Sequence, residues 1–335
     1  MSERSHKGPM RRAVISGYGA SVPEKILTND DLSKMVDTSD EWITTRTGIK
    51  RRHIASDEET TGTLSTQAAE KALEKAGIRG EELELIIVGT ITPEMVFPST
   101  ACFVQKALGA SDAWAFDLAA ACSGFLYGLG IAQQYIESGT INKALIIGAE
   151  TLSKITNWKE RTSCVLFGDG AGAVVLEGRE DSHGILYSKM HSGSEGLELL
   201  QCKAYGSRHP VSRPLEDPDM VYMWLNGRAV FQQATRWIIE SVEECMRECK
   251  LDVEDVALVI PHQMNSRIIL SVAKRMQFSN EQIFVNIAEY GNTSAASIPI
   301  AFDEAMESRR LKKGDIVIFV SFGAGFTWGA NVIKV

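Results

Sequence analysis

The sequence predicts an α/β fold built from two similar halves. Short apolar strands alternate with amphipathic helices along the chain, which is typical of a largely parallel sheet covered by helices. The alternation then repeats, because residues 68–90 resemble residues 241–263 at an offset of 173. Each half alone would leave one sheet face uncovered. We therefore expect one compact body with five layers in the order αβαβα and halves related by a pseudo-twofold axis.

The expected elements follow in chain order. The first half has strands at 13–18, 83–90, 113–118 and 143–150, and helices at 65–77 and after Cys122; the second half has a helix at 241–250 and strands within 253–263 and at 283–287. The chain is expected to divide into a disordered leader at 1–10, an N-terminal half at 11–180 and a C-terminal half at 181–335. Three prolines and no periodicity indicate a surface excursion at 201–220.

The composition excludes several classes of function. The chain has 335 residues, of which 44% are hydrophobic and 23% charged, and its formal net charge is −8. This acidic balance argues against nucleic acid or an anionic membrane surface as a partner. No apolar run approaches the roughly twenty residues of a membrane span, and the charged opening residues do not form a signal peptide. We expect a cytoplasmic protein.

The cysteines and glycines do not indicate a metal centre or a dinucleotide site. The six cysteines lack paired C-x-x-C spacing, and Cys245 and Cys249 are too few ligands for zinc without others nearby. The glycines of ISGYGASVP and FGDGAGAV do not have the spacing of a dinucleotide-binding fingerprint. We expect neither a metal nor a nicotinamide cofactor.

The first candidate for chemistry is Cys122, in the stretch FDLAAACSGFLYGL. It follows an apolar strand and opens a glycine-rich apolar helix. The start of a helix favours the thiolate, which is the form that attacks carbonyl carbons. A thiol packed in a core gives the same local pattern, so this motif alone leaves both interpretations open.

Two further candidates lie in the second half. His262 follows the strand of VALVIPHQMN, at the sheet edge where α/β enzymes place their ligand crevice. Asn292 lies in EYGNTSAAS, and an offset of 170 aligns it with Cys122. A structural hydrogen bond for His262 and a helix cap for Asn292 are the simpler alternatives. The duplication directs these loops toward one centre, however, and the glycine-rich turn of VSFGAGFTWG has N–H groups suited to an oxyanion. Together they favour an active site.

Seven stretches, in the same order, resemble the β-ketoacyl-[acyl-carrier-protein] synthase III family, thiolase-fold enzymes that initiate bacterial fatty acid synthesis. They are VDTSDEWITTRTGIKRRHIA, FPSTACFVQKALG, AAACSGFLYGL, FGDGAGAV, PHQMNSRII, EYGNTSAAS and FGAGFTWG. The resemblance covers nearly the whole chain. It implies a thiolase-like fold, a homodimer, no cofactor, and decarboxylative condensation of an acyl-CoA with malonyl-[acyl-carrier-protein].

The resemblance also implies roles for individual residues. Cys122 would carry the acyl group, and His262 and Asn292 would stabilise the enolate formed when carbon dioxide leaves. The N–H groups of Cys122 and Ala324 would form the oxyanion hole, with Ala324 in place of the glycine common in the family. Phe322 would exclude water as a gatekeeper.

The binding residues are implied in the same way. Phe97 resembles a residue that closes the partner's acyl pocket across the dimer interface, and its bulk favours acetyl as the primer. Met264 stands where alanine is common in the pantetheine channel. The coenzyme A site would contain Thr38, Trp42, Arg46, Arg161, Gly227, Phe231 and Asn265, and the acidic carrier protein would bind Arg267, Lys274 and Arg275.

Three alternatives remain open on the sequence. One is a condensing enzyme of secondary metabolism that uses the same residues on another primer. The second is a noncatalytic binding module for a carrier protein or coenzyme A, in which Cys122 is only a core thiol. The third is a cysteine hydrolase, which would need a base positioned for water.

Overall fold

A computed structural model describes residues 11–335, and its first sheet has five strands in the order β1-β7-β6-β4-β5. The leader expected at 1–10 lies outside the described residues. Strands β4, β5 and β6 are mutually parallel, whereas β7 and β1 are antiparallel to their neighbours. The sheet is therefore mixed rather than largely parallel. Its strands are β1 (Arg11–Ser21), β4 (Leu85–Gly89), β5 (Trp114–Leu118), β6 (Lys143–Thr151) and β7 (Asp169–Glu180).

The second sheet has four strands in the order β11-β12-β13-β8. Only β11 and β12 are parallel, because β13 and β8 are added by antiparallel pairing. The strand expected at 283–287 is reduced to a single bridge between Ile283 and Val259. The strands are β8 (Gly184–Ser192), β11 (Val256–Pro261), β12 (Ile316–Gly323) and β13 (Thr327–Lys334).

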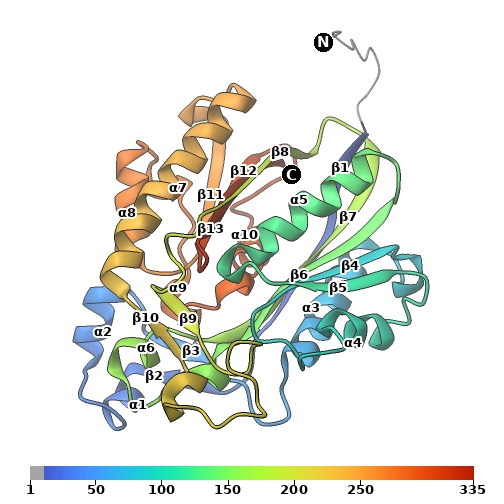
Figure 1. The fold of residues 1–335 in the computed structure, drawn as a ribbon. Coiled ribbons are helices and arrows are strands. Elements are labelled where there is room, and N and C mark those ends of the chain that lie inside the picture. Colours follow the sequence, from blue (N-terminus) through green and yellow to red (C-terminus); the bar gives the residue numbers. More distant parts are fainter. Residues whose placement is uncertain (1–10) are drawn as a thin grey trace.

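Helices cover both sheets and also fill the space between them, which confirms the five-layer αβαβα arrangement (Figure 1). Helices α3 and α4 pack on the outer face of the first sheet, α5 and α10 lie between the sheets, and α7 and α8 pack outside the second sheet. Their bounds are α3 (Thr61–Ala76), α4 (Thr100–Ala107), α5 (Gly124–Glu137), α7 (Gly227–Cys249), α8 (Ser266–Arg275) and α10 (Ser297–Glu307).

The central layer needs very close packing, since two helices must fit between two sheets. Phe125, Leu129, Phe302 and Phe319 are fully buried in the shared core. A side chain at Gly148 of β6 would place its Cβ 2.1 Å from the carbonyl oxygen of Ala295. Glycine is therefore required at this position, where the loop before α10 approaches the first sheet.

Smaller elements surround the central end of the two sheets. A two-stranded ribbon of β9 and β10 flanks the 201–220 excursion, whose residues form turns and the short helix η4. The other small elements are β2 (Ile26–Thr28), β3 (Arg51–His53), β9 (Leu200–Cys202), β10 (Met223–Leu225), α1 (Asn29–Ser33), α2 (Asp40–Thr47), α6 (Arg161–Cys164) and α9 (Ile287–Tyr290). The 3-10 turns are η1 (Gly80–Glu82), η2 (Ala121–Ser123), η3 (Leu152–Ile155), η4 (Pro218–Val221), η5 (Val253–Asp255), η6 (Asn280–Gln282) and η7 (Ser294–Ala296).

The internal repeat is visible in the strand register. Leu85 pairs with Ala144 in the first sheet, and Leu258 pairs with Val317 in the second, a constant shift of 173 residues. We propose that the halves meet near residue 180, in the turn between β7 and β8.

The same shift corrects one alignment made from the sequence. It relates Ala121 to Ser294, and both have left-handed backbones, with φ of 45° and 49°. Cys122 therefore corresponds to Ala295, so aligning it with Asn292 was wrong by three residues. The reason is the short helix α9, which lengthens the second half just before this loop. The two loops are still equivalent as loops.

Candidate active site

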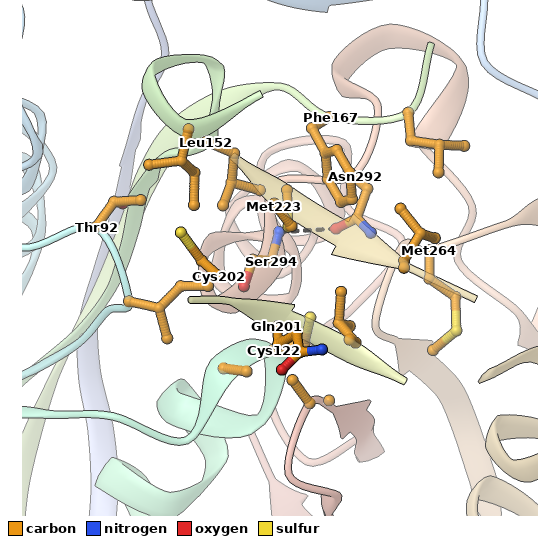
Figure 2. A pocket seen from close by; sticks show the side chains of 18 of the residues that line it. Thr92, Cys122, Leu152, Phe167, Gln201, Cys202, Met223, Met264, Asn292 and Ser294 are labelled. Atoms are coloured by element: carbon orange, nitrogen blue, oxygen red, sulfur yellow. Dashed lines mark hydrogen bonds between the residues drawn. The ribbon is translucent and has the colours of Figure 1, made fainter. Parts of the chain in front are cut away.

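The candidate active site is a cavity of about 810 Å³ where loops from both halves meet (Figure 2). Cys122 from the first half and His262 and Asn292 from the second all line it. Phe322 and Ala324 line it as well, and Phe322 is only 2% exposed. The three residues expected to carry the chemistry thus come together.

Hydrogen bonds from the second half fix the loop that holds Cys122. The Ser321 hydroxyl donates to the carbonyl oxygen of Cys122 at 2.8 Å. The Ser123 hydroxyl donates to the carbonyl oxygen of Thr327 at 3.1 Å. Cys122 is the middle residue of η2, two residues before Gly124, the first residue of α5. The thiol is therefore positioned by contacts between the halves as well as by its own helix.

Cys122 is half-buried as a residue and lines the cavity, but the pKa of its thiol is raised rather than lowered. Burial raises the pKa to about 12, and the nearby Glu150 carboxyl contributes in the same direction. The Ser294 hydroxyl opposes this shift, because it can donate to the thiolate once that form is present. Desolvation thus outweighs the helix start, which was expected to favour the thiolate.

The turn before β13 lies beside the backbone of Cys122. A Cβ at Gly323 would be 2.8 Å from the Cys122 nitrogen, so only glycine permits this approach. The Thr327 hydroxyl is 2.8 Å from the carbonyl oxygen of Ala120 and 3.3 Å from that of Ala324. It therefore connects the two loops. Ala324 itself does not have a positive φ, whereas Gly325 does, at 136°. The methyl group of Ala324 thus causes no left-handed strain.

His262 is 1% exposed, and its ring is oriented by a serine on α10. Its Nδ1 lies 2.6 Å from the Ser297 hydroxyl oxygen, which also accepts the Gln263 backbone N–H at 3.4 Å. Because that oxygen already accepts the Gln263 N–H, we assign the serine proton to the bond with Nδ1, which places the imidazole proton on Nε2. Burial lowers the pKa of His262 to about 3, and the ring is a neutral hydrogen-bond donor.

Asn292 is oriented by its own loop. Its side-chain oxygen accepts the backbone N–H of Ser294 at 2.9 Å (Figure 2). Its backbone donates to the carbonyl oxygen of Leu166 and accepts from the N–H of Gly168. Because the oxygen is engaged, the side-chain N–H₂ is the group left to serve a ligand in the cavity.

One buried carboxyl near the site was missed in the sequence. Glu150 at the end of β6 is fully buried and accepts hydrogen bonds from Thr90, Ile91, Thr92 and Ser294. Burial raises its pKa to about 7. The signal was available, because KALIIGAE ends an otherwise apolar strand with a carboxylate beside the threonines that follow β4.

The residues expected to bind coenzyme A form two groups. Gly227, Phe231 and Asn265 line the cavity, as does Met264. Trp42 lies outside it, with the guanidinium carbons of Arg46 and Arg161 at 4.4 Å and 4.9 Å from its ring centroid. The two groups are joined, since the Asn265 amide donates to the carbonyl oxygen of Arg46 at 3.0 Å. Thr38 is half-buried between α1 and α2, and its hydroxyl has no hydrogen-bond partner in the described part of the chain.

The remaining candidates lie on the surface, away from the cavity lining. Arg267, Lys274 and Arg275 are all exposed on one face of α8, which we call the basic face of α8. Phe97 is 81% exposed in the loop before α4.

Two general features of the described residues, 11–335, also bear on function. They contain no cluster of three or more His, Cys, Asp or Glu side chains that could hold a metal ion. None of their helices has the length and apolar character needed to cross a membrane.

Comparison with known proteins gives consistent matches. Residues 116–194 match the family described as 3-oxoacyl-[acyl-carrier-protein (ACP)] synthase III, and residues 246–335 match its C-terminal family. The chain is 51% identical to a β-ketoacyl-[acyl-carrier-protein] synthase III of Caldanaerobacter subterraneus. The match extends over 322 residues and covers 96% of this chain and 97% of that relative.

Solved structures are similar over the same range. A 3-oxoacyl-[acyl-carrier-protein] synthase III from Aquifex aeolicus is 47% identical with a TM-score of 0.90, covering 96% of this chain and 100% of that one. The priming β-ketosynthase of the R1128 polyketide pathway is 30% identical with a TM-score of 0.89, and the match covers 99% of this chain and 98% of that one.

Proposed function

Because the chain belongs to the β-ketoacyl-[acyl-carrier-protein] synthase III family and is a condensing acyltransferase of fatty acid synthesis, we propose that its cavity joins an acyl-CoA to malonyl-[acyl-carrier-protein]. The products are a 3-oxoacyl-[acyl-carrier-protein], coenzyme A and carbon dioxide. The observation that carries the proposal is the convergence of Cys122, His262 and Asn292 on one cavity from both halves. Neither the binding-module nor the hydrolase alternative accounts for that set.

The first half-reaction loads the acyl group. The Cys122 thiol attacks the acyl-CoA carbonyl carbon, and the new thioester keeps the acyl group activated. The N–H groups of Cys122 and Ala324 stabilise the oxyanion, since preorganised donors act where charge develops. The contact of Gly323 with the Cys122 backbone and the Thr327 hydrogen bonds support this pairing. Phe322, buried beside Ala324, serves as the gatekeeper that excludes water.

The second half-reaction forms the carbon–carbon bond. Loss of carbon dioxide from malonyl-[acyl-carrier-protein] leaves an enolate, whose oxygen accepts hydrogen bonds from His262 Nε2 and the Asn292 amide. Both groups are neutral donors with their other polar atom already engaged, which supports this role. The enolate carbon then attacks the acyl group on Cys122. No general base is needed, because decarboxylation generates the carbanion directly.

Coenzyme A binds along the cavity and across its mouth. Gly227, Phe231 and Asn265 line the pantetheine channel, and Trp42 with Arg161 binds the adenine, for which an aromatic face and a guanidinium plane are suited. Thr38 and Arg46 complete this site. The Asn265–Arg46 hydrogen bond supports one continuous channel.

The acidic carrier protein binds the basic face of α8. Arg267 lies in the first turn of α8, beside the N-cap Asn265 that lines the channel, and Lys274 and Arg275 follow in the last turn of the same helix. Electrostatic complementarity of this kind guides docking more than it adds affinity.

We propose a homodimer formed along β5, the edge strand of the first sheet. Trp114 on β5 is 42% exposed, and Met95, Val96 and Phe97 are 45%, 87% and 81% exposed. Apolar groups gathered at a free sheet edge favour association. Phe97 of one protomer then closes the acyl pocket of the other, and its bulk favours acetyl-CoA as the primer.

The reaction needs no cofactor, since both thioesters are substrates and decarboxylation drives the condensation. We place the enzyme in the cytoplasm, where these two water-soluble substrates meet. A condensing enzyme of secondary metabolism is the second candidate, favoured by the similarity to the polyketide priming synthase. The two differ in the primer that they accept.

Intact-mass measurement tests the proposal. The protein is incubated with a panel of acyl-CoA thioesters and then chased with malonyl-[acyl-carrier-protein]. We expect an acetyl adduct on Cys122 that the chase converts to 3-oxoacyl carrier protein, and Cys122→Ser should block loading. Absence of any adduct refutes the nucleophile, release of free acid refutes condensation, and selective loading of long primers favours the second candidate.

A further inference from the structure

The proposed loading step leaves open where the Cys122 proton goes. The thiol has a pKa of about 12, so it needs a proton acceptor when it attacks the thioester. His262 is a poor acceptor, because its pKa is near 3 and the Ser297 hydroxyl occupies its Nδ1. The Glu150 carboxyl, with a pKa near 7, is the buried group beside this cavity that can take up a proton at neutral pH.

A single hydroxyl links that carboxyl to the nucleophile. The Ser294 hydroxyl donates to Glu150 Oε1 at 3.1 Å. Ser294 and Cys122 both line the cavity, and the Ser294 side chain lies close enough to the thiol to lower its pKa. Figure 2 shows Ser294 beside Cys122 at the cavity. Ser294 has a left-handed backbone with φ of 49°, which costs energy for a residue other than glycine. The strained conformation holds this hydroxyl between the two groups.

We propose that Glu150 accepts the Cys122 proton through the Ser294 hydroxyl during acyl loading and returns it after condensation. The inference rests on the proposed role of Cys122 as acyl carrier. Glu150 does not touch the substrate, so it acts through Ser294.

The proton balance closes over both half-reactions. In loading, the bond between Cys122 Sγ and the acyl carbon forms and the acyl–sulfur bond of coenzyme A breaks. The thiol proton moves to Ser294 while the Ser294 proton moves to Glu150, and the coenzyme A thiolate takes a proton from water. In condensation, the enolate displaces Cys122 as a thiolate, and protonated Glu150 restores the thiol by the reverse path.

The surroundings of Glu150 suit a group that changes protonation state. Burial raises its pKa, while Thr92, whose hydroxyl donates to Oε2 at 2.6 Å, and the other donors stabilise the charged form. The titratable groups nearby are engaged elsewhere: Asp169 on β7 binds the Ser153 hydroxyl and Ala55 N–H, and Lys154 binds the carbonyl oxygen of Glu59. The cavity lining also contains Cys122, Cys202, Tyr205 and the neutral His262.

The test measures loading against pH in single turnover. Acetyl-CoA acylates wild type, Glu150→Gln and Ser294→Ala between pH 5.5 and 9, and carbon dioxide release from malonyl-[acyl-carrier-protein] is followed in parallel. In wild type, we expect loading to rise with pH and level off above an inflection near 7. Both variants should load at least about tenfold more slowly at pH 7.5, without the inflection, while decarboxylation stays within about twofold.

A matched control separates the relay from general loss of a buried carboxyl. Asp169→Asn removes the buried carboxyl on the neighbouring strand, which is hydrogen-bonded to Ser153 and Ala55 rather than to Ser294, and it should keep the inflection. The proposal is overturned if Glu150→Gln keeps the wild-type rate and inflection, or if loading and decarboxylation fall equally. If Glu150→Gln does not fold, Ser294→Ala decides by the same criteria.

Alkylation of Cys122 by iodoacetamide distinguishes this inference from the proposed function. If wild type forms no acetyl adduct, the proposed function fails. The alkylation rate is then measured against pH in wild type and in Glu150→Gln. An inflection that wild type shows and Glu150→Gln lacks would still support Glu150 as the proton acceptor, and the same pH profile in both proteins would overturn that role.

Discussion

Replacing Ser297 with alanine should slow decarboxylation without slowing acyl loading. The Ser297 hydroxyl lies 2.6 Å from His262 Nδ1, and it accepts the Gln263 N–H, so its proton selects the imidazole form that donates from Nε2. Ser297→Ala leaves Nδ1 buried without a partner and removes that selection. Ser297 is a positioning residue, because it acts through His262.

The structure sets the size of this effect. A buried polar group that loses its hydrogen bond costs about 1–3 kcal/mol. Each 1.4 kcal/mol corresponds to a factor of about ten in rate. We therefore expect carbon dioxide release from malonyl-[acyl-carrier-protein] to fall roughly five- to 150-fold, while Cys122 loading changes by less than about twofold.

The assay follows both half-reactions separately, by carbon dioxide release and by intact mass. Ser241→Ala is a matched control, since it removes an equally buried hydroxyl, on α7, that donates to the Trp237 carbonyl oxygen away from the site. It should leave both half-reactions unchanged. Decarboxylation at the wild-type rate in Ser297→Ala, or an equal fall in loading, would refute the reasoning. Nitrogen NMR of labelled histidine should show the Nε2–H form in wild type and a mixture in the variant.

Four further predictions follow from the site. Asn292→Asp keeps the acceptor for the Ser294 N–H but removes the amide donor, so carbon dioxide release should fall about 10²–10³-fold with loading largely intact; equal losses would contradict the assignment. Gly323→Ala places a Cβ 2.8 Å from the Cys122 nitrogen and should slow loading at least about tenfold. Gly130→Ala on α5 should not, because its Cβ would meet its nearest neighbours at 3.7 Å, an ordinary contact distance. Glu150 has a folded pKa near 7, above its unfolded value near 4.5, so the folded protein binds the proton more tightly. The contribution of Glu150 to stability is therefore present below pH 4.5 and lost as pH rises through 7. In thermal unfolding, Glu150→Gln should remove about 3 kcal/mol of this pH dependence, and an unchanged curve of stability against pH would argue against the raised pKa. Charge reversal on the basic face of α8 should raise KM for malonyl-[acyl-carrier-protein], most at low salt, and leave KM for acetyl-CoA unchanged; a change in both would point to a folding defect.

Much of the fold was predictable because it is written in local patterns. Apolar strands such as β4 and β6 and the amphipathic helix α3 follow from periodicity, and the repeat predicted that two halves would share one core. Strand direction was less predictable. The antiparallel addition of β7 and β13 is set by pairing across the sheet, which periodicity does not report. Residues 324–326 form a tight turn from β12 to β13, whereas residues 152–168, with η3 and α6, connect β6 to β7.

Sequence alone determined the residue types of the site, because a thiol, an imidazole and an amide, each after a strand, together with the family motifs, already indicated a condensing enzyme. Tertiary structure decided their chemical states. Desolvation makes the Cys122 thiol weakly acidic, and the Ser297 hydroxyl, 35 residues further along the chain, fixes which nitrogen of His262 donates. The Asn292 side chain is instead oriented within its own loop, by the Ser294 backbone N–H. It also revealed Glu150, whose hydrogen-bond partners come from the loop after β4 and from η7. Protonation depends on which groups surround an atom in space, and neighbours in sequence do not supply that information.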